Sequence, residues 1–190
     1  HAVVAHYLPH TDPVHRISIV SRGTTGGHTL VPPAIDRYTE TRTRLLERVA
    51  TLLGGRAAED MIFKEYTTGA SSDLEIASAV ARQMVEDFGM SDLGPTIFAP
   101  KTGMADVIYG ENTHVSPEVA AKIDKEISKI VDEGYKVAKD VLIKHRKQLD
   151  LVADTLLVKE TLERDQFEKL VGKPVSNGEV KFRKARTAQA

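Results

Sequence analysis

Most of the chain follows a helical pattern of apolar residues. From about residue 38 to residue 171, apart from a predicted loop at residues 94–115, apolar side chains recur at three- and four-residue steps, the spacing that places them on one face of a helix. The clearest segment begins at Ser116-Pro117-Glu118, which has a capping serine, a proline at the first helical position and an acid in the first turn. A long helix is predicted to run from there to about His145, with an apolar stripe of Ile123, Ile127, Ile130, Val137 and Val141 in which Gly134 fills the gap. A second helix, to about residue 157, is expected to fold back on it as a hairpin.

Two helices are predicted around a pair of glycines upstream of this hairpin. Apolar residues from Leu45 to Leu53 form one stripe, Gly54 and Gly55 interrupt it, and a helical pattern resumes as far as Phe63. A glycine inside a helix costs about 1 kcal/mol relative to alanine. The pair therefore indicates a bend or an unusually close contact.

Capping boxes predict the ends of two further helices. Ser72 with Glu75 has the spacing of a capping box, and Gly89 is a typical residue just after a helix end. Asp165 with Glu168 marks a second, smaller box. A helix is therefore expected from Ser72 to about Gly89, and another from Asp165.

A β-hairpin is predicted near the start of the chain. Residues 14–21 alternate, with Ile17 and Ile19 expected on one face, and residues 28–31 suit a short return strand after the glycine-rich turn 22–27. No other β region is expected. Residues 1–8 have the pattern of a helix end stopped by a proline, and the earlier turns of that helix are expected before His1.

Composition limits the chemistry that the chain can perform. The 190 residues suit one domain or two small ones, and the formal net charge of −1 gives no general attraction for nucleic acid. Because the chain has no cysteine, any metal must be held by histidines and carboxylates. No run approaches the roughly 20 apolar residues of a membrane span. Residues 172–190 are polar and basic and are predicted to be a disordered tail.

The seven histidines alone do not establish a metal site. His1 and His6 are five residues apart, and on a helix this is a rotation of roughly 140°, so they cannot bind one metal from the same face. The ordinary interpretation of each histidine is a solvated side chain without a ligand role. The other five are His10, His15, His28, His114 and His145.

Two acidic residues are better candidates. Asp73 lies in the first turn of a predicted helix, where the helix dipole favours a carboxylate. It is interpreted either as an ordinary first-turn acid or as a rigidly held metal ligand. Glu59 follows the glycine pair on a helix, and it is either an exposed surface acid or a partner that orients a ligand histidine.

Several stretches of the chain together resemble one family, the FtsH-like membrane-anchored AAA zinc metalloproteases, in their C-terminal peptidase domain. The stretches cover about residues 1–170 and occur in family order. They are His1-Ala-Val-Val-Ala, Asp12-Pro-Val-His-Arg-Ile-Ser-Ile, Arg22-Gly, Leu53-Gly-Gly-Arg-Ala-Ala-Glu59, Thr67-Thr-Gly-Ala-Ser-Ser-Asp73-Leu, Ala81-Arg-x-Met84, Phe88-Gly-Met-Ser, Leu93-Gly-Pro95 and Ile123-Asp-x-Glu126.

The resemblance implies a zinc site. His1 aligns with the second histidine of the family's HExxH motif, so it and Asp73 are implied zinc ligands. The first histidine and the general-base glutamate are expected four and three residues before His1 and are absent from this chain. Glu59 matches a family acid near the site and is given a supporting role. Two histidines and one carboxylate leave a position open for water, on which the glutamate acts as general base.

The implied fold is a mainly α metallopeptidase domain, residues 1–171, with a small β-hairpin or sheet near the zinc and a long C-terminal helical hairpin. The implied function is ATP-dependent zinc metalloendopeptidase activity against unfolded, damaged or short-lived membrane and soluble proteins. ATP and Mg²⁺ would bind an AAA module outside this chain. Extended protein substrates and a homo-hexamer are the implied partners, and nucleic acid is not.

A membrane anchor outside the chain is also implied. The peptidase domain is expected on the cytoplasmic side of a bacterial inner membrane, with a mitochondrial or plastid membrane as the alternatives. Strand 14–21 is a hypothetical docking edge for an extended substrate. The rival functions are a helical oligomerisation or binding module, and a degenerate family member without catalysis. A His-Glu pair upstream of His1 would favour the protease.

Overall fold

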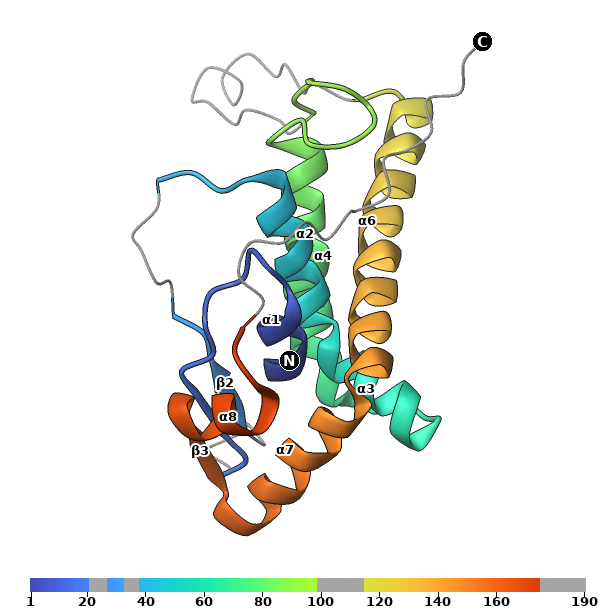
Figure 1. Ribbon diagram of the computed structural model, residues 1–190. Helices are drawn as coiled ribbons and strands as arrows, with labels where there is room; N and C mark the ends of the chain where they lie inside the picture. The colour runs from blue at the N-terminus through green and yellow to red at the C-terminus, as the bar shows by residue number, and fades with distance from the viewer. Residues whose placement is uncertain (21–26, 33–37, 99–114, 175–190) are drawn as a thin grey trace. The chain divides into compact units, whose positions relative to one another are not determined.

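The computed structural model describes residues 1–20, 27–32, 38–98 and 115–174, and these residues are mainly helical (Figure 1). The helices are α1 (Ala2–Tyr7), α2 (Arg42–Leu52), α3 (Gly54–Phe63), α4 (Ser71–Glu86), α6 (Pro117–Lys144), α7 (Arg146–Lys159) and α8 (Arg164–Val171), with a 3₁₀ turn η1 (Thr68–Ala70). The strands are β1 (Arg16–Ser18), β2 (His28–Leu30) and β3 (Thr161–Glu163). The predicted mainly α fold with a small sheet is confirmed.

The chain divides into two compact units. The first contains His1 and residues 37–144, and the second contains residues 2–36 and 145–190. No helix in the described ranges is both long enough and apolar enough to cross a bilayer. Parts of the predicted glycine-rich turn, of the loop 94–115 and of the basic tail lie outside the described residues.

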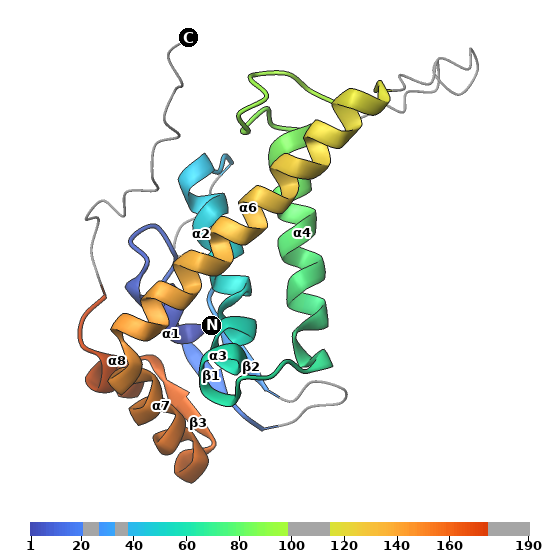
Figure 2. The ribbon, with the colours of Figure 1, turned by 90° about the vertical axis from the view of Figure 1, so that its right-hand side faces the viewer.

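The first unit is built around α6, which contacts α2, α3 and α4 (Figure 2). Its buried stripe begins as predicted with Ile123, Ile127 and Ile130. It then continues in steps of four through Gly134, Ala138 and Leu142, and not through Val137 and Val141. The small side chains explain the difference, because they allow α2 to approach α6. A Cβ at Gly134 would lie 2.8 Å from Val49 Cγ1.

Asp60 fastens α3 to α6. Its Oδ2 accepts hydrogen bonds from Tyr135 Oη at 2.9 Å and from Lys139 Nζ at 2.6 Å. The Lys139 bond, followed by the Tyr135 bond, lowers the pKa of Asp60, while burial and the Asp60 bond raise the pKa of Tyr135. Beside this group, the guanidinium of Arg56 lies 3.5 Å above the centre of the Tyr66 ring. These contacts hold the helix that contains Gly55 and Glu59.

The start of α6 is the predicted one. Pro117 is its first residue, and the Val119 backbone N–H donates to Ser116 Oγ at 3.4 Å. Proline lacks the N–H that would be unpaired at this position, so it suits the first helical residue. Lys144 ends the helix, and α7 follows after His145.

The two predicted capping boxes are wrong in position. Ser72 lies inside α4, which begins at Ser71 directly after the 3₁₀ turn, and Thr67 caps that turn by accepting from the Gly69 N–H at 3.2 Å. At the last helix the box is formed by Glu163 and Gln166, two residues earlier than expected. In both places the chain offers more than one capping residue, and the residue that caps lies earlier than the predicted one.

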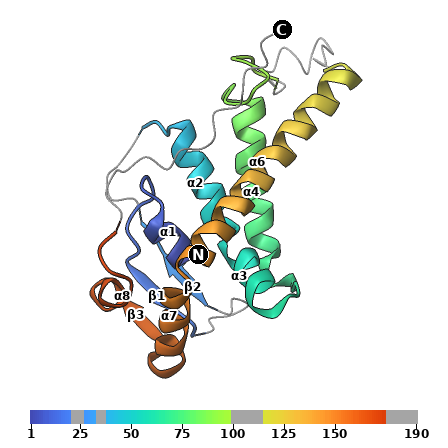
Figure 3. The same cartoon turned by 45° about the vertical axis from the view of Figure 1, so that its right-hand side comes forward.

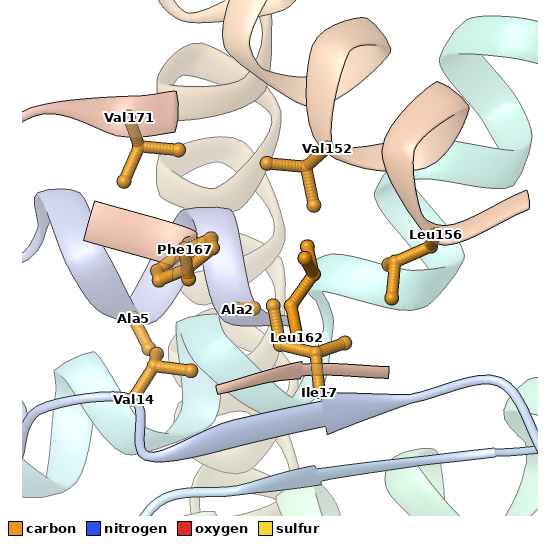
Figure 4. Close-up of a cluster of buried hydrophobic side chains, with 9 residues drawn as sticks. All are labelled: Ala2, Ala5, Val14, Ile17, Val152, Leu156, Leu162, Phe167 and Val171. Atoms are coloured by element: carbon orange, nitrogen blue, oxygen red, sulfur yellow. The ribbon is translucent and has the colours of Figure 1, made fainter. Parts of the chain in front are cut away.

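The second unit is a three-stranded antiparallel sheet with α7 and α8 packed against it (Figure 3). Its core is one cluster of buried side chains around Phe167, which is fully buried (Figure 4). The members are Ala2, Ala5, Val14, Ile17, Val152, Leu156, Leu162, Phe167 and Val171. The cluster brings side chains of α1 and α8 together, although these are the first and last helices in the described part of the chain.

The sheet differs from the predicted hairpin in two ways. β3 was not expected, because three residues between two helices are too few to show alternation. Ile19 was expected on the same face of the strand as Ile17, but β1 ends at Ser18, and Ile19 is 40% exposed whereas Ile17 is buried. Because β1 pairs with β2 on one side and β3 on the other, it has no free edge, and the proposed docking of an extended substrate on this strand is wrong.

His6 is a core residue and not a solvated one. Its side chain packs edge-on against the Tyr7 and Phe167 rings, and its Nε2 has no hydrogen-bond partner among the described residues. The Tyr7 ring also stacks on His145, with ring centres 3.5 Å apart. Burial lowers the pKa of His6, with a smaller opposing contribution from Glu168.

This buried imidazole should make the protein sensitive to acid. Because the pKa of His6 is lower in the folded chain, the unfolded chain takes up the proton first as the pH falls below about 6.5. The stability contributed by neutral His6 is thus complete above that pH and is lost below it, down to the lowered pKa. In urea unfolding from pH 7.5 to 5, His6→Leu should show a flatter loss of stability than wild type. Parallel curves for the two proteins would contradict this assignment.

Candidate metal centre

The first unit brings His1 and Asp73 together, although 71 residues separate them in the chain. His1 Nε2 lies 3.2 Å from Asp73 Oδ2, and each side chain is 32% exposed. Asp73 lies in the first turn of α4, where the helix dipole favours a negative charge. The pair is thus half-buried and open to solvent, as a site for water and an external substrate requires.

The other ring nitrogen of His1 is held by α2. Nδ1 lies 2.9 Å from the Thr51 carbonyl oxygen, in the last turn of that helix. A carbonyl oxygen can only accept, so Nδ1 must be the nitrogen that carries the proton and donates. In the neutral imidazole, Nε2 is then left with a lone pair. A backbone carbonyl that orients a histidine in this way is the usual support for a metal ligand.

His1 Nε2 and Asp73 Oδ2 face each other at this site. With Nδ1 as the donor, the lone pair of Nε2 faces the carboxylate oxygen, and two lone pairs at 3.2 Å repel one another. A cation held between the two atoms would remove this repulsion, so a metal ion is an occupant that the pair could bind.

The spacing of the two atoms fits zinc. Zinc binds histidine nitrogen and carboxylate oxygen at about 2.0–2.2 Å in tetrahedral sites, which places two such ligand atoms roughly 3.3–3.5 Å apart. The 3.2 Å between Nε2 and Oδ2 is close to that value. Among the residues that the structure describes, no group of three or more histidines, cysteines or acids could hold a metal. The present pair would thus supply part of a ligand set.

Glu59 contacts the loop before Asp73 and not the histidine. Its Oε1 accepts from Thr67 Oγ1 at 2.5 Å, and its Oε2 accepts from the Thr67 backbone N–H at 3.3 Å. The Thr67 hydroxyl bond is the main reason that the pKa of Glu59 is lowered. Thr67 also caps the 3₁₀ turn that leads into α4. Glu59 thus connects α3 to the segment that positions Asp73, and the carbonyl of Thr51 has the orienting role toward His1.

Removing the Thr67 hydroxyl should release Glu59. In Thr67→Val, the main hydrogen bond to the carboxylate and the cap of the 3₁₀ turn are both lost. The pKa of Glu59, followed by NMR titration, should rise toward its ordinary value, and the free energy of unfolding should fall by about 1 kcal/mol, as for other lost caps. Thr67→Ser keeps the hydroxyl and should resemble wild type. An unchanged pKa of Glu59 in the valine variant would show that this bond is not formed.

Two parts of this site had no signal in the sequence. The Thr51 group is a backbone carbonyl, which any residue could provide. Thr67 is one of several residues that could cap the helix start, and only its contact with Glu59 distinguishes it. His1 and Asp73 themselves were proposed from the family resemblance, since neither pattern alone separated a ligand from an ordinary residue.

Comparison with known proteins places the chain in a family. A family model described as peptidase family M41 matches residues 1–170. Similar proteins include the ATP-dependent zinc metalloprotease FtsH of Pseudothermotoga lettingae, with 47% identity over 99% of this chain and 31% of the relative. The FtsH 1 protein of Conexibacter woesei is 45% identical over 90% of this chain and 27% of its own length.

The FtsH protein of Thermotoga maritima is 44% identical over 90% of this chain and 29% of its own length. The chain thus spans under a third of each of these relatives. The matched region includes His1, Glu59 and Asp73. The chain belongs to peptidase family M41.

Proposed function

We propose that this chain is the peptidase region of an ATP-dependent zinc metalloendopeptidase. The observation that carries the proposal is the His1–Asp73 pair, whose facing Nε2 and Oδ2 atoms lie 3.2 Å apart, close to the spacing of two zinc ligands. The family match over residues 1–170 supports the same chemistry, because the related proteins are named zinc metalloproteases.

His1 Nε2 and the Asp73 carboxylate would hold the zinc, together with a histidine expected upstream of His1. A zinc ion bound there supplies Lewis-acid activation of water for attack on a peptide carbonyl. The chain's own residues contribute orientation. The Thr51 carbonyl fixes the tautomer of His1, and Glu59 holds the Thr67 turn that presents Asp73. Glu59 is proposed as a supporting residue, and the general base is a glutamate expected upstream of His1.

The other parts of the proposed ATP-dependent protease lie outside this chain. An AAA module that binds ATP and Mg²⁺ would unfold and deliver substrates, a membrane anchor would fix the protein to a bacterial inner membrane, and the assembly would be a homo-hexamer. The related proteins are named ATP-dependent, which supports the first of these. Residues 1–171 are proposed as the peptidase domain and residues 172–190 as a disordered tail.

Unfolded, damaged or short-lived membrane and soluble proteins are the proposed substrates, bound in an extended form. Since β1 is paired on both sides, an extended chain would have to add to an outer strand of the sheet. β2 is the better candidate, because it is the more exposed outer strand and its Leu30 is 47% exposed.

Metal analysis and proteolysis of the full-length protein test this function. The purified protein should contain one zinc per subunit and should degrade casein only when ATP is present. A zinc chelator should stop casein cleavage while ATP hydrolysis continues, and added zinc should restore it. The matched control is the same protein with a nonhydrolysable ATP analogue.

The rival functions make different predictions. A helical oligomerisation or binding module, or a family member that has lost catalysis, would be metal-free and would leave casein intact. A full-length protein without zinc or without chelator-sensitive cleavage would therefore overturn the proposal.

A further inference from the structure

Gly55 lies against the ring of His1. It is the second residue of α3, just after the break that separates this helix from α2. A Cβ at this position would lie 2.7 Å from His1 Nε2 and 3.1 Å from His1 Cε1. Real side chains essentially never approach another atom as closely as the first of these distances. A residue with a side chain at position 55 would therefore displace the His1 ring.

The ring has little freedom to move aside. Its Nδ1 is held by the Thr51 carbonyl at 2.9 Å, and its Nε2 faces Asp73 at 3.2 Å. A ring that moves away from a Cβ at position 55 must weaken one or both of these contacts. The three atoms nearest to such a Cβ all belong to the His1 ring. A side chain at position 55 would thus contact the candidate ligand itself.

Backbone conformation does not explain a glycine here. Gly55 is helical and is not among the residues with a positive φ. Alanine is the better helix former, so a helix without other constraints would be more stable with alanine at this position. The contact with His1 is the feature of this site that requires the absence of a side chain.

We propose that Gly55 is a positioning residue of the zinc site, and that its missing side chain allows His1 Nε2 to face Asp73. This inference rests on the proposed zinc-dependent function. It gives a physical reason for one of the two glycines that interrupt the helical pattern at residues 54 and 55, and it assigns to α3 a direct part in shaping the metal site.

The test is Gly55→Ala in the full-length protein, with zinc affinity measured by competition with a chromophoric chelator. Supports of a metal ligand typically change metal affinity by 10–100-fold when they are altered, so zinc should bind roughly 10–100 times more weakly. The visible spectrum of the Co²⁺-substituted protein should also change, because it reports ligand geometry. Zinc affinity within twofold of wild type, with an unchanged Co²⁺ spectrum, would overturn the proposal.

Gly134→Ala is the matched control. It is the same substitution in a helix of the same unit, but its Cβ would meet Val49 Cγ1 at 2.8 Å in the core. This variant should unfold at a lower urea concentration and yet, where folded, bind zinc as wild type does. Gly55→Ala should instead bind zinc more weakly without a comparable loss of stability in urea. Equal losses of zinc affinity in both variants would mean that a general loss of packing is responsible, which also contradicts the proposal.

A double-mutant cycle in metal-free protein tests the close contact between position 55 and the His1 ring. In chelator-treated protein, Gly55→Ala is made in two backgrounds, the wild type and His1→Ala. It should lower the free energy of unfolding more in the wild type, because His1→Ala lacks the ring that the added Cβ would contact. Identical effects in the two backgrounds would contradict the contact. A wild-type protein that binds no zinc would overturn the proposed function and this inference together, whereas a zinc-binding wild type with an unaffected alanine variant would overturn the role of Gly55 alone.

Discussion

Asp73→Ala should remove zinc-dependent proteolysis while leaving the protein folded. Asp73 provides the oxygen that faces His1 Nε2, so under the proposed function its loss would remove a ligand and not only a support. Zinc affinity and casein cleavage by the full-length protein should each fall by at least about 100-fold, the upper end of the effect of altering a ligand's support. Stability should fall by no more than about 1 kcal/mol, the value of an acid in the first turn of a helix.

Glu75→Ala provides the control for charge. Glu75 is an exposed acid near the same helix start, and its removal takes away one negative charge from the same turn region. Zinc content and cleavage should stay at the wild-type level in this variant. Full activity in Asp73→Ala, or equal losses in both variants, would contradict the assignment of Asp73 as a ligand.

Phe167→Ala should destabilise the second unit more than any other substitution named above. Its ring is fully buried at the centre of the cluster in Figure 4 and packs edge-on against His6. Truncating a buried phenylalanine leaves a cavity and costs about 3–5 kcal/mol. Urea unfolding followed by circular dichroism should show a loss of this size.

Phe63→Ala is the comparison for this change. The Phe63 side chain is 73% exposed at the end of α3, so its removal should change stability by less than about 0.5 kcal/mol. A loss below about 1.5 kcal/mol in Phe167→Ala would mean that the buried cluster does not close the second unit as described.

The parts of the fold that were predicted correctly are those with several agreeing local signals. Helix α6 has a capping serine, an N-terminal proline and a long apolar stripe, and its start is the predicted one. Periodicity failed where packing chose between neighbouring residues. The buried face of α6 continues through Ala138 instead of Val137 because a small residue permits close helix contact.

Tertiary contacts decided the positions that local patterns left open. Residues 67–72 offer several capping side chains in a row, and the bond between Thr67 and Glu59 selects the first. Likewise, the pairing of β3 with β1 holds the chain extended through Glu163, so α8 is capped by Glu163 and begins at Arg164. Neither partner is near in sequence, so local patterns could not identify these ends.

The candidate site was predicted only in part for the same reason. His1 and Asp73 are far apart in the chain, and only their resemblance to a family motif linked them. The geometry adds the Thr51 carbonyl and the bare surface of Gly55, which give His1 its tautomer and its direction. These features depend on the bend between α2 and α3. The glycine pair indicated this bend, but it did not show that Thr51 and Gly55 contact His1 there.

The most direct test of the central claim is anomalous X-ray diffraction at the zinc absorption edge from crystals of the full-length protein. We expect one anomalous peak per subunit, within about 2.0–2.2 Å of both His1 Nε2 and an Asp73 carboxylate oxygen. Crystals of Asp73→Ala should show this peak lost or strongly reduced. A zinc peak bound by other residues, or no peak in protein that still cleaves casein, would contradict the account.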